Sequence, residues 1–301
     1  MTTWALDIQR GWRLGLVFVV GLVLLAAVLI VTVALNSLTI LTFLLSLVAI
    51  AALAGAGVIS YWLWGLVNAS YTMDRNAVVI HWGGYMHQIP LAEIREVLRG
   101  SEVEGLRLQS LFCWPGYLVG RGSAPALGQI LFYATQPLDA QLILRAESGT
   151  YAISPIDWEG FITAFSERME LGATQDVTAV STHPAFLDWP IWQDQMALGL
   201  WGSSLVVLAL LVAGLCGLYP FLPPEIPLQI TREGEILRMT GAGRIFYFAL
   251  LGVLFLLVNG GAGMYFYQRE RDHAIAYFFW SGTLLLQGSL WVAAVAVLLN
   301  L

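Results

Sequence analysis

The sequence predicts an α-helical membrane protein with about five transmembrane helices and an α+β domain inserted between the second and the third. Three observations predict this class. Of the 301 residues, 58% are hydrophobic and 11% are charged, whereas charged residues make up about a quarter of a typical soluble domain. Five apolar stretches are long enough to cross a bilayer. One long polar segment, residues 70–195, carries strand and helix patterns.

Composition and charge exclude several other classes. A chain this rich in apolar residues is not disordered. Its two cysteines cannot form a disulfide framework or a four-thiolate zinc site. All 14 basic residues are Arg, and the net charge is −6, which argues against a nucleic-acid partner. We therefore expect the apolar segments to lie in a lipid bilayer.

The five apolar stretches predict the helices. A helix rises about 1.5 Å per residue, so about 20 apolar residues cross the bilayer core. The stretches lie at residues 14–35, 38–67, 196–218, 245–267 and 274–299. Asn36 and Ser37 leave room for only a short turn, so residues 1–69 are expected to form a helical hairpin. Residues 196–301 are expected to hold the remaining three helices.

Arginines beside these stretches predict the orientation, because loops on the cytoplasmic side carry more Arg and Lys. One side has Arg10, Arg13, Arg75, Arg269 and Arg271, and the other has Arg232, Arg238 and Arg244. This difference places residues 70–195 in the cytoplasm and the loop 220–244 outside. Residues 70–195 hold 14 acidic and 7 basic side chains, a net charge of −7.

The polar segment begins with a pattern of short strands. Residues 77–82 alternate with a period of two, Gly83-Gly84 is typical of a hairpin turn, and residues 85–89 return as the next strand. Further short runs lie at residues 94–98, 129–135, 141–145 and 150–153. Many short strands at such spacing predict a small antiparallel sandwich or barrel.

One helix is expected to close this domain. Ser154 is a candidate N-cap and Pro155 a candidate first helical residue, and Asp157 follows three residues after the cap. Apolar residues then recur at helical spacing, at Trp158, Phe161, Ile162, Phe165 and Met169. Gly172 is a natural end. Residues 173–195 are expected to be a linker back to the membrane.

Several phrases follow the first two helices in a fixed order: Tyr71–Gly83, Ile89–Leu91, Trp114–Tyr117, Leu131–Thr135 and Tyr151–Pro155. Together they resemble the membrane-anchored bacterial pleckstrin-homology (PH)-like domains across residues 60–172. The resemblance implies a strongly bent antiparallel β-barrel with a carboxyl-terminal helix over residues 70–172. It also implies a noncatalytic scaffold that binds protein, peptide or lipid, or assembles with itself.

Phosphoinositide-binding relatives of such domains carry a cluster of Lys and Arg around the first hairpin. Here that region offers only Arg75, with His81 and His87. Phosphate recognition needs concentrated donors and positive charge, so we do not expect inositol-phosphate binding.

A second resemblance covers residues 219–299. Pro223-Pro224-Glu225-Ile226-Pro227-Leu228 leads into Gly234, and two helices follow with Asn259 and a loop at Arg269-Glu270. This arrangement resembles the membrane unit of bacterial immunity proteins against the sporulation-delaying toxin. Gln229-Ile230-Thr231 stands where that family commonly has a His-plus-Asn phrase, so the resemblance concerns architecture more than function.

The best candidates for contact with a partner are Trp114, Tyr117 and Arg121, in an aromatic and Gly-rich segment. One interpretation exposes this segment at the mouth of the barrel or in the membrane interface. The other has Trp114 plugging the barrel. His81 and His87 flank the hairpin turn and could approach each other, but two histidines without a third ligand make a poor zinc site.

We expect no catalytic, cofactor-binding or metal-binding residues. Asp157 and Glu159 are explained by the start of a helix, and the mid-span segments hold no titratable residue that could serve a pump. The sequence predicts a noncatalytic scaffold in the bacterial cytoplasmic (inner) membrane, with a protein partner or self-association. The alternatives are a toxin-immunity or envelope-stress receptor that uses loop 220–244, and a membrane transporter or enzyme.

Overall fold

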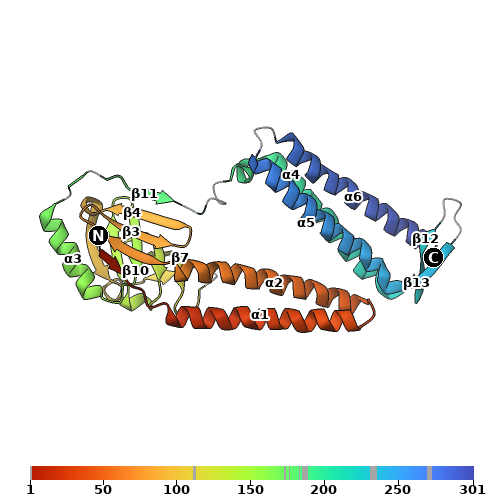
Figure 1. The fold of residues 1–301 in the computed structure, drawn as a ribbon, viewed down its shortest axis with the longest axis horizontal. Coiled ribbons are helices and arrows are strands. Elements are labelled where there is room, and N and C mark those ends of the chain that lie inside the picture. Colours follow the sequence, from red (N-terminus) through yellow and green to blue (C-terminus); the bar gives the residue numbers. More distant parts are fainter. Residues whose placement is uncertain are drawn as a thin grey trace. The chain divides into compact units, whose positions relative to one another are not determined.

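The computed structural model describes residues 2–110, 113–172, 174–175, 177–182, 184, 189–230, 236–269 and 273–301. The chain divides into two compact units (Figure 1). The first combines Met1–Leu24 with Ala52–Asp188, and the second combines Leu25–Ala51 with Trp189–Leu301. Each unit therefore takes in one half of the helical hairpin.

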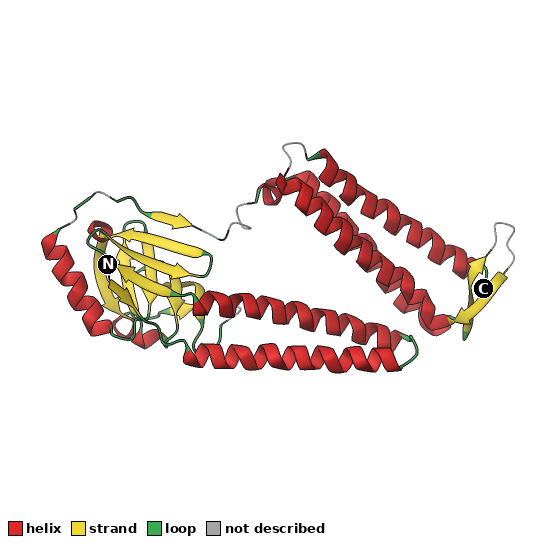
Figure 2. Ribbon diagram, in the orientation of Figure 1, coloured by secondary structure: helices red, strands yellow, loops and turns green. Residues whose placement is uncertain are grey.

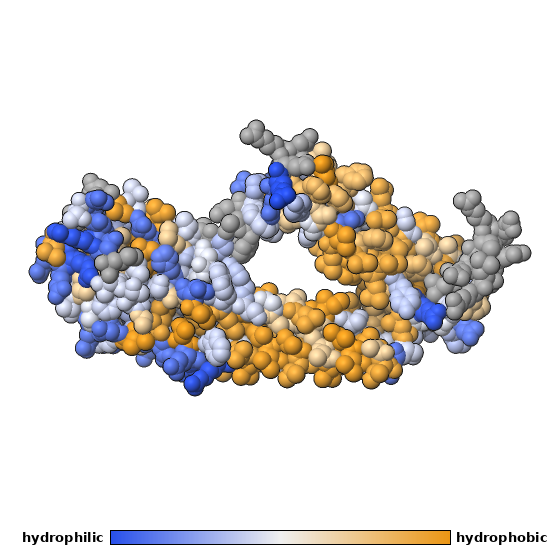
Figure 3. All heavy atoms as spheres, in the orientation of Figure 1, coloured by the Kyte–Doolittle hydropathy of each residue, from blue (hydrophilic) through white to orange (hydrophobic). Residues whose placement is uncertain are grey.

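The described residues contain five helices that are long and apolar enough to cross a membrane. They are α1 (Gln9–Leu35), α2 (Ile40–Val67), α4 (Gln195–Leu218), α5 (Phe246–Arg269) and α6 (Ala274–Leu299). Apolar side chains cover the outside of the hairpin (Figure 3), and Leu35 is 81% exposed. Helix α1 begins at Gln9, five residues before the predicted apolar stretch 14–35. The helix can extend into polar residues because its backbone hydrogen bonds form within the helix whatever the side chains are.

The first unit contains a five-stranded antiparallel sheet in the order β1-β2-β3-β4-β11. The strands are β1 (Thr2–Trp4), β2 (Ser70–Met73), β3 (Ala77–Trp82), β4 (Tyr85–Pro90) and β11 (Val180–Thr182). Strands β1 and β11 come from outside residues 70–172 and occupy the two edges of the sheet. The β3–β4 hairpin turns at Gly83-Gly84, as the sequence predicts.

The second sheet has six strands in the order β5-β9-β10-β8-β7-β6. They are β5 (Ile94–Arg99), β6 (Arg107–Leu108), β7 (Leu118–Ala124), β8 (Gly128–Ala134), β9 (Leu142–Ala146) and β10 (Gly149–Ile153). Figure 2 shows the strands of the first unit in yellow. The expectation of a strongly bent antiparallel β-barrel is wrong on two counts. The sheets are separate, since β1 and β11 cover the edges of the first, and β10 pairs with β8 in parallel.

Helix α3 (Trp158–Leu171) closes the domain, but it begins differently from the prediction. Its N-cap is Asp157, whose Oδ1 accepts the Gly160 amide at 2.9 Å. Ser154 does not cap it: its buried hydroxyl accepts the Thr135 amide at 2.7 Å, and Pro155 forms a β-bridge with Leu6. The chain at Ser154 and Pro155 is therefore held extended against its neighbours. Phe161 of α3 is buried in the core of the domain.

The core of the domain lies between the two sheets and α3. Its fully buried members include Tyr71, Met73, Ile80, Ile89, Leu142, Ile153 and Phe161. The Tyr71 hydroxyl links the sheets, because it donates to the Tyr133 carbonyl at 2.5 Å and accepts the Ser154 amide at 3.1 Å. Burial raises the pKa of Tyr71, although its bonds to Ser154 act in the opposite direction.

The second unit is a helical bundle with a short strand pair. Strands β12 (Glu225–Ile230) and β13 (Ile236–Gly241) pair antiparallel. They lie within the loop 220–244, of which residues 231–235 are outside the described residues. Phe43 of α2 stacks on Phe246 of α5, with ring centroids 4.5 Å apart. Gln287 of α6 is fully buried.

Candidate functional site at the base of the helical hairpin

The loop around Trp114 packs against both helices of the hairpin. Trp114 and Tyr117 bond to each other through their backbones, and their rings stack with centroids 4.3 Å apart. The Trp114 Nε1 donates to the Gly11 carbonyl of α1 at 2.9 Å. The Trp62 ring of α2 lies 6.2 Å from the Trp114 ring. This aromatic loop therefore joins the domain to the place where α1 begins and α2 ends.

Two contacts between glycines set how closely the domain approaches the hairpin. A Cβ on Gly11 would lie 2.1 Å from the Gly116 carbonyl oxygen, and a Cβ on Gly83 would lie 2.9 Å from the Gly65 Cα. Gly116 has φ +93° and Gly83 has φ +58°, which favour glycine because it lacks a Cβ. Backbone thus touches backbone at α1 and at α2, and a side chain on Gly11, Gly116 or Gly83 would clash there.

The three predicted contact residues have different surroundings. Tyr117 is buried, and burial raises its pKa. Trp114 is half-buried between Tyr117 and the hairpin, so it packs on the helices and does not plug a barrel. Arg121 is exposed on β7, and its guanidinium makes no hydrogen bond or ion pair with the described residues. Contact with a partner remains a prediction for all three.

The two hairpin histidines point to opposite faces of their sheet. His81 pairs with Met86, and His87 pairs with Ile80. Since neighbouring strand residues alternate between faces, the expected approach of His81 to His87 does not occur. His87 is 1% exposed, and its Nε2 lies 2.8 Å from the Tyr133 hydroxyl. Its Nδ1 lies 2.7 Å from Ser181 Oγ, a bond that ties β11 to β4.

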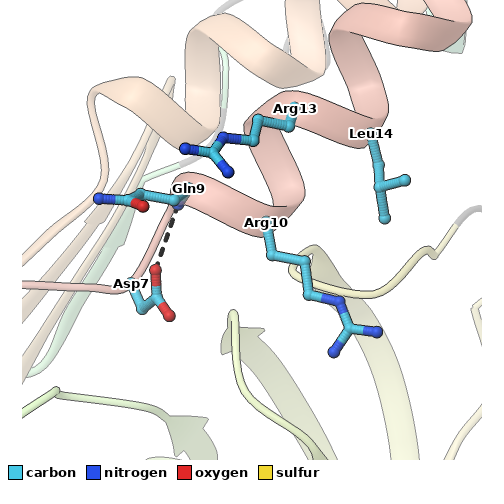
Figure 4. A pocket seen from close by; sticks show the side chains of 5 residues that line it. All are labelled: Asp7, Gln9, Arg10, Arg13 and Leu14. Atoms are coloured by element: carbon cyan, nitrogen blue, oxygen red, sulfur yellow. Dashed lines mark hydrogen bonds between the residues drawn. The ribbon is translucent and has the colours of Figure 1, made fainter.

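A polar pocket of about 430 Å³ opens beside this junction, at the start of α1 (Figure 4). Its lining residues are Asp7, Gln9, Arg10, Arg13 and Leu14. Asp7 Oδ1 accepts the Gln9 amide at 3.3 Å, which satisfies one free donor at the helix start. From the sequence, Arg10 and Arg13 predict only the orientation. Their spacing of three residues is the signal of a shared site, because it places both on neighbouring positions of one helix.

A second pocket, of about 410 Å³, lies in the other unit. Its lining residues are Trp189, Pro190, Ile191, Met264, Tyr267, Gln268 and His273. Nearby, Asp194 accepts the hydroxyls of Tyr267 at 3.0 Å and Tyr277 at 2.5 Å, and it caps α4. Desolvation alone would raise the pKa of Asp194, but these hydrogen bonds outweigh it and lower the pKa. Asp194 thereby joins α4, α5 and α6 at one end.

Within the described ranges, no group of three or more His, Cys, Asp or Glu residues could hold a metal ion. Asp157 has its capping role, and Glu159 lies in the first turn of α3. Cys113 is exposed and Cys216 half-buried, and both are free thiols. Both acidic residues therefore belong to the start of α3, although Asp157 itself is the cap in place of Ser154.

Residues 69–169 match the family model described as the bacterial PH domain. This match supports a PH-like domain in the part of the chain where the resemblance was noted. No curated protein and no solved structure matches the chain. The resemblance of residues 219–299 to immunity proteins finds no support in these comparisons.

Proposed function

We propose that the chain is a noncatalytic, membrane-anchored scaffold that acts through its PH-like domain on the cytoplasmic side of the bacterial inner membrane. The domain binds a protein partner or a second copy of the chain. The observation that carries this proposal is the docking of the domain on the hairpin through Gly11–Gly116 and Gly65–Gly83. A domain held at two backbone contacts keeps one orientation above the bilayer.

Aromatic side chains at the hairpin base support a position at the membrane surface. Trp12, Tyr61 and Trp64 are exposed there, and such residues favour the interface between lipid and water. The domain is therefore placed next to the headgroups, and its outer surface faces the aqueous phase. That surface carries mixed charges, including the Arg95–Glu147 ion pair at 2.9 Å.

A scaffold works by presenting a surface, so the test is contact at that surface. A photo-crosslinking amino acid at Arg121 should give a discrete protein adduct in intact cells, because this position is exposed on β7. An adduct of twice the chain mass would identify self-association, and any other discrete mass would identify a protein partner.

The matched control places the same amino acid at Val28, an exposed apolar position of α1. This position should give lipid adducts and no discrete protein band. Met169, exposed on α3, serves as a second position on the domain. The proposal fails if neither domain position gives a protein adduct, or if Val28 gives the same bands as Arg121.

A further inference from the structure

We propose that the pocket at the start of α1 binds the phosphate group of an anionic phospholipid through Arg10 and Arg13. This inference goes beyond the scaffold function and does not depend on which partner the domain contacts. It rests on the pocket, its charges and its place on the hairpin.

The charges of the pocket favour an anion. Its lining holds two guanidinium groups and one carboxylate, and that carboxylate accepts the Gln9 amide. Neither Arg10 nor Arg13 makes a hydrogen bond or ion pair with the residues that the structure describes. Arginine presents a planar fork of donors that matches the oxygens of a phosphate. The pocket therefore offers donors that the protein itself does not use.

The position of the two arginines along α1 matches the depth of a lipid headgroup. Trp12 lies between them in sequence and is 40% exposed, as expected of an aromatic residue at the interface. Leu14, Val17 and Phe18 follow at helical spacing, and the last two are 68% and 53% exposed. A phosphate at Arg10 and Arg13 would thus leave the acyl chains beside an apolar helix surface. This continuity favours a lipid over a soluble phosphate.

Electrostatics give a second reason for an anion here. The amino end of a helix carries a partial positive charge, so Arg10 and Arg13 at the first turns of α1 are unfavourably placed without an anion. A phosphate bound at Arg10 and Arg13 would reduce this penalty, because its negative charge opposes both the guanidinium groups and the partial positive charge of the helix start.

Figure 4 shows the two guanidinium groups extending in different directions from α1, Arg13 toward the side of Gln9 and Arg10 toward the opposite side. Both side chains are exposed, and exposed side chains change rotamer within nanoseconds. A bound phosphate would restrict the rotamers of Arg10 and Arg13. It would not break any hydrogen bond or ion pair between these side chains and the described residues.

The test measures phosphatidylglycerol adducts on the purified full chain by native mass spectrometry, with phosphatidylcholine as the reference lipid. The double variant Arg10→Gln/Arg13→Gln should bind phosphatidylglycerol at least about tenfold more weakly, because the loss of even one charge-assisted hydrogen bond has about that effect and the variant removes both guanidinium groups. The matched control, Arg244→Gln/Arg269→Gln, removes two arginines beside α5 and should bind like the wild type. Equal losses in the two double variants would overturn the proposal, because they would indicate general surface attraction.

A second variant covers the case in which the glutamine pair fails to insert or fold. Arg10→Lys/Arg13→Lys keeps both charges but removes the planar forks, so it should bind several-fold more weakly than the wild type. Wild-type binding by this variant would overturn the assignment to the two guanidinium groups. A further arm adds inorganic phosphate at millimolar concentration: unchanged lipid binding supports a lipid site, and full competition would assign the pocket to a soluble anion instead.

Discussion

At the scale of single residues, glycines determine how the domain meets the hairpin. Gly11 and Gly116 lie so close that a Cβ on either would penetrate the other's backbone. Gly21, on the same helix, has nothing within 4 Å of its Cβ position. Gly11 therefore lies in a close contact and Gly21 does not, although both belong to α1. Replacing each of them by Ala gives a matched pair of substitutions.

We expect Gly11→Ala to lower the free energy of unfolding by about 1–3 kcal/mol, the usual range for overpacking a close contact. Gly21→Ala should cause no loss, because its new methyl group meets open space. Urea denaturation of the purified chain in detergent, followed by tryptophan fluorescence, measures both changes. Wild-type stability in Gly11→Ala would mean that the domain does not rest on α1 as described.

Residue-level prediction from sequence succeeded where one local rule decides the outcome. The Gly83-Gly84 turn follows from turn chemistry, and helical spacing indicates the face of α3 that buries Phe161, although Met169 of the predicted face is exposed. Ser154 was expected to cap α3, and Asp157 does so, because the Ser154 hydroxyl accepts the amide of Thr135, the residue that follows β8. Local rules cannot detect such competition, since it depends on which strand lies beside the candidate cap.

At the scale of elements, the two sheets are held together by buried tyrosines. Tyr71 of β2 bonds to Tyr133 of β8, and Tyr133 in turn contacts His87 of β4. Burial raises the pKa of both tyrosines above the ordinary value of 10.0. Their neutral form is thus favoured in the folded domain more than in the unfolded chain.

This difference predicts that the domain loses stability at alkaline pH. Below about pH 10 the tyrosines are neutral in both states, so the contribution is complete. Above it the unfolded chain loses protons that the folded domain retains, so the free energy of unfolding falls as the pH rises. Urea denaturation between pH 8 and pH 11 should show this fall.

Tyr71→Phe provides the control for that experiment. It should cost about 1–3 kcal/mol at pH 8, because the buried Ser154 amide loses its acceptor. It should also make stability less dependent on pH, since one titrating group is gone. An unchanged pH dependence would show that Tyr71 does not contribute to it.

Elements with a long periodic pattern could be predicted from the sequence. Very short strands could not, and neither could the choice of neighbour for each strand. The expected stretches at residues 38–67 and 274–299 correspond closely to α2 and α6. Strands β1 and β11 have three residues each, too few for a period to be recognised. The parallel β8–β10 pair escaped prediction as well, because alternation marks a strand but not its neighbour.

At the scale of the whole molecule, the number of membrane crossings decides which surfaces share a compartment. If each of the five helices crosses the membrane, α1 and α2 return the chain to its starting side, and α4, α5 and α6 place the carboxyl end on the other. The candidate site could be predicted in part: Trp114 and Tyr117 were singled out by composition, but their docking on Gly11 needed the fold. The pocket of Arg10 and Arg13 was missed for the same reason.

Cysteine accessibility tests this arrangement. With Cys113 and Cys216 replaced by Ser, single cysteines are placed at Glu104 in the domain and at Glu225, the first residue of β12, both exposed positions. An impermeant reagent applied to intact cells should label only the Glu225 position. Labelling of the Glu104 position alone would place the domain outside the cytoplasmic membrane and reverse the proposed orientation.

Strand β1 has a consequence for the order in which the protein is made. It leaves the ribosome before α1 and α2, yet its partner β2 follows both helices. The pairing of Thr3 with Thr72 can form only after both helices have been made and β2 lies on the same side of the membrane as β1. A hairpin that crossed the membrane only once would leave β1 and β2 on opposite sides, and the edge of β2 would stay unpaired. Completion of this sheet therefore requires that α1 and α2 together return the chain to the side of its first residues.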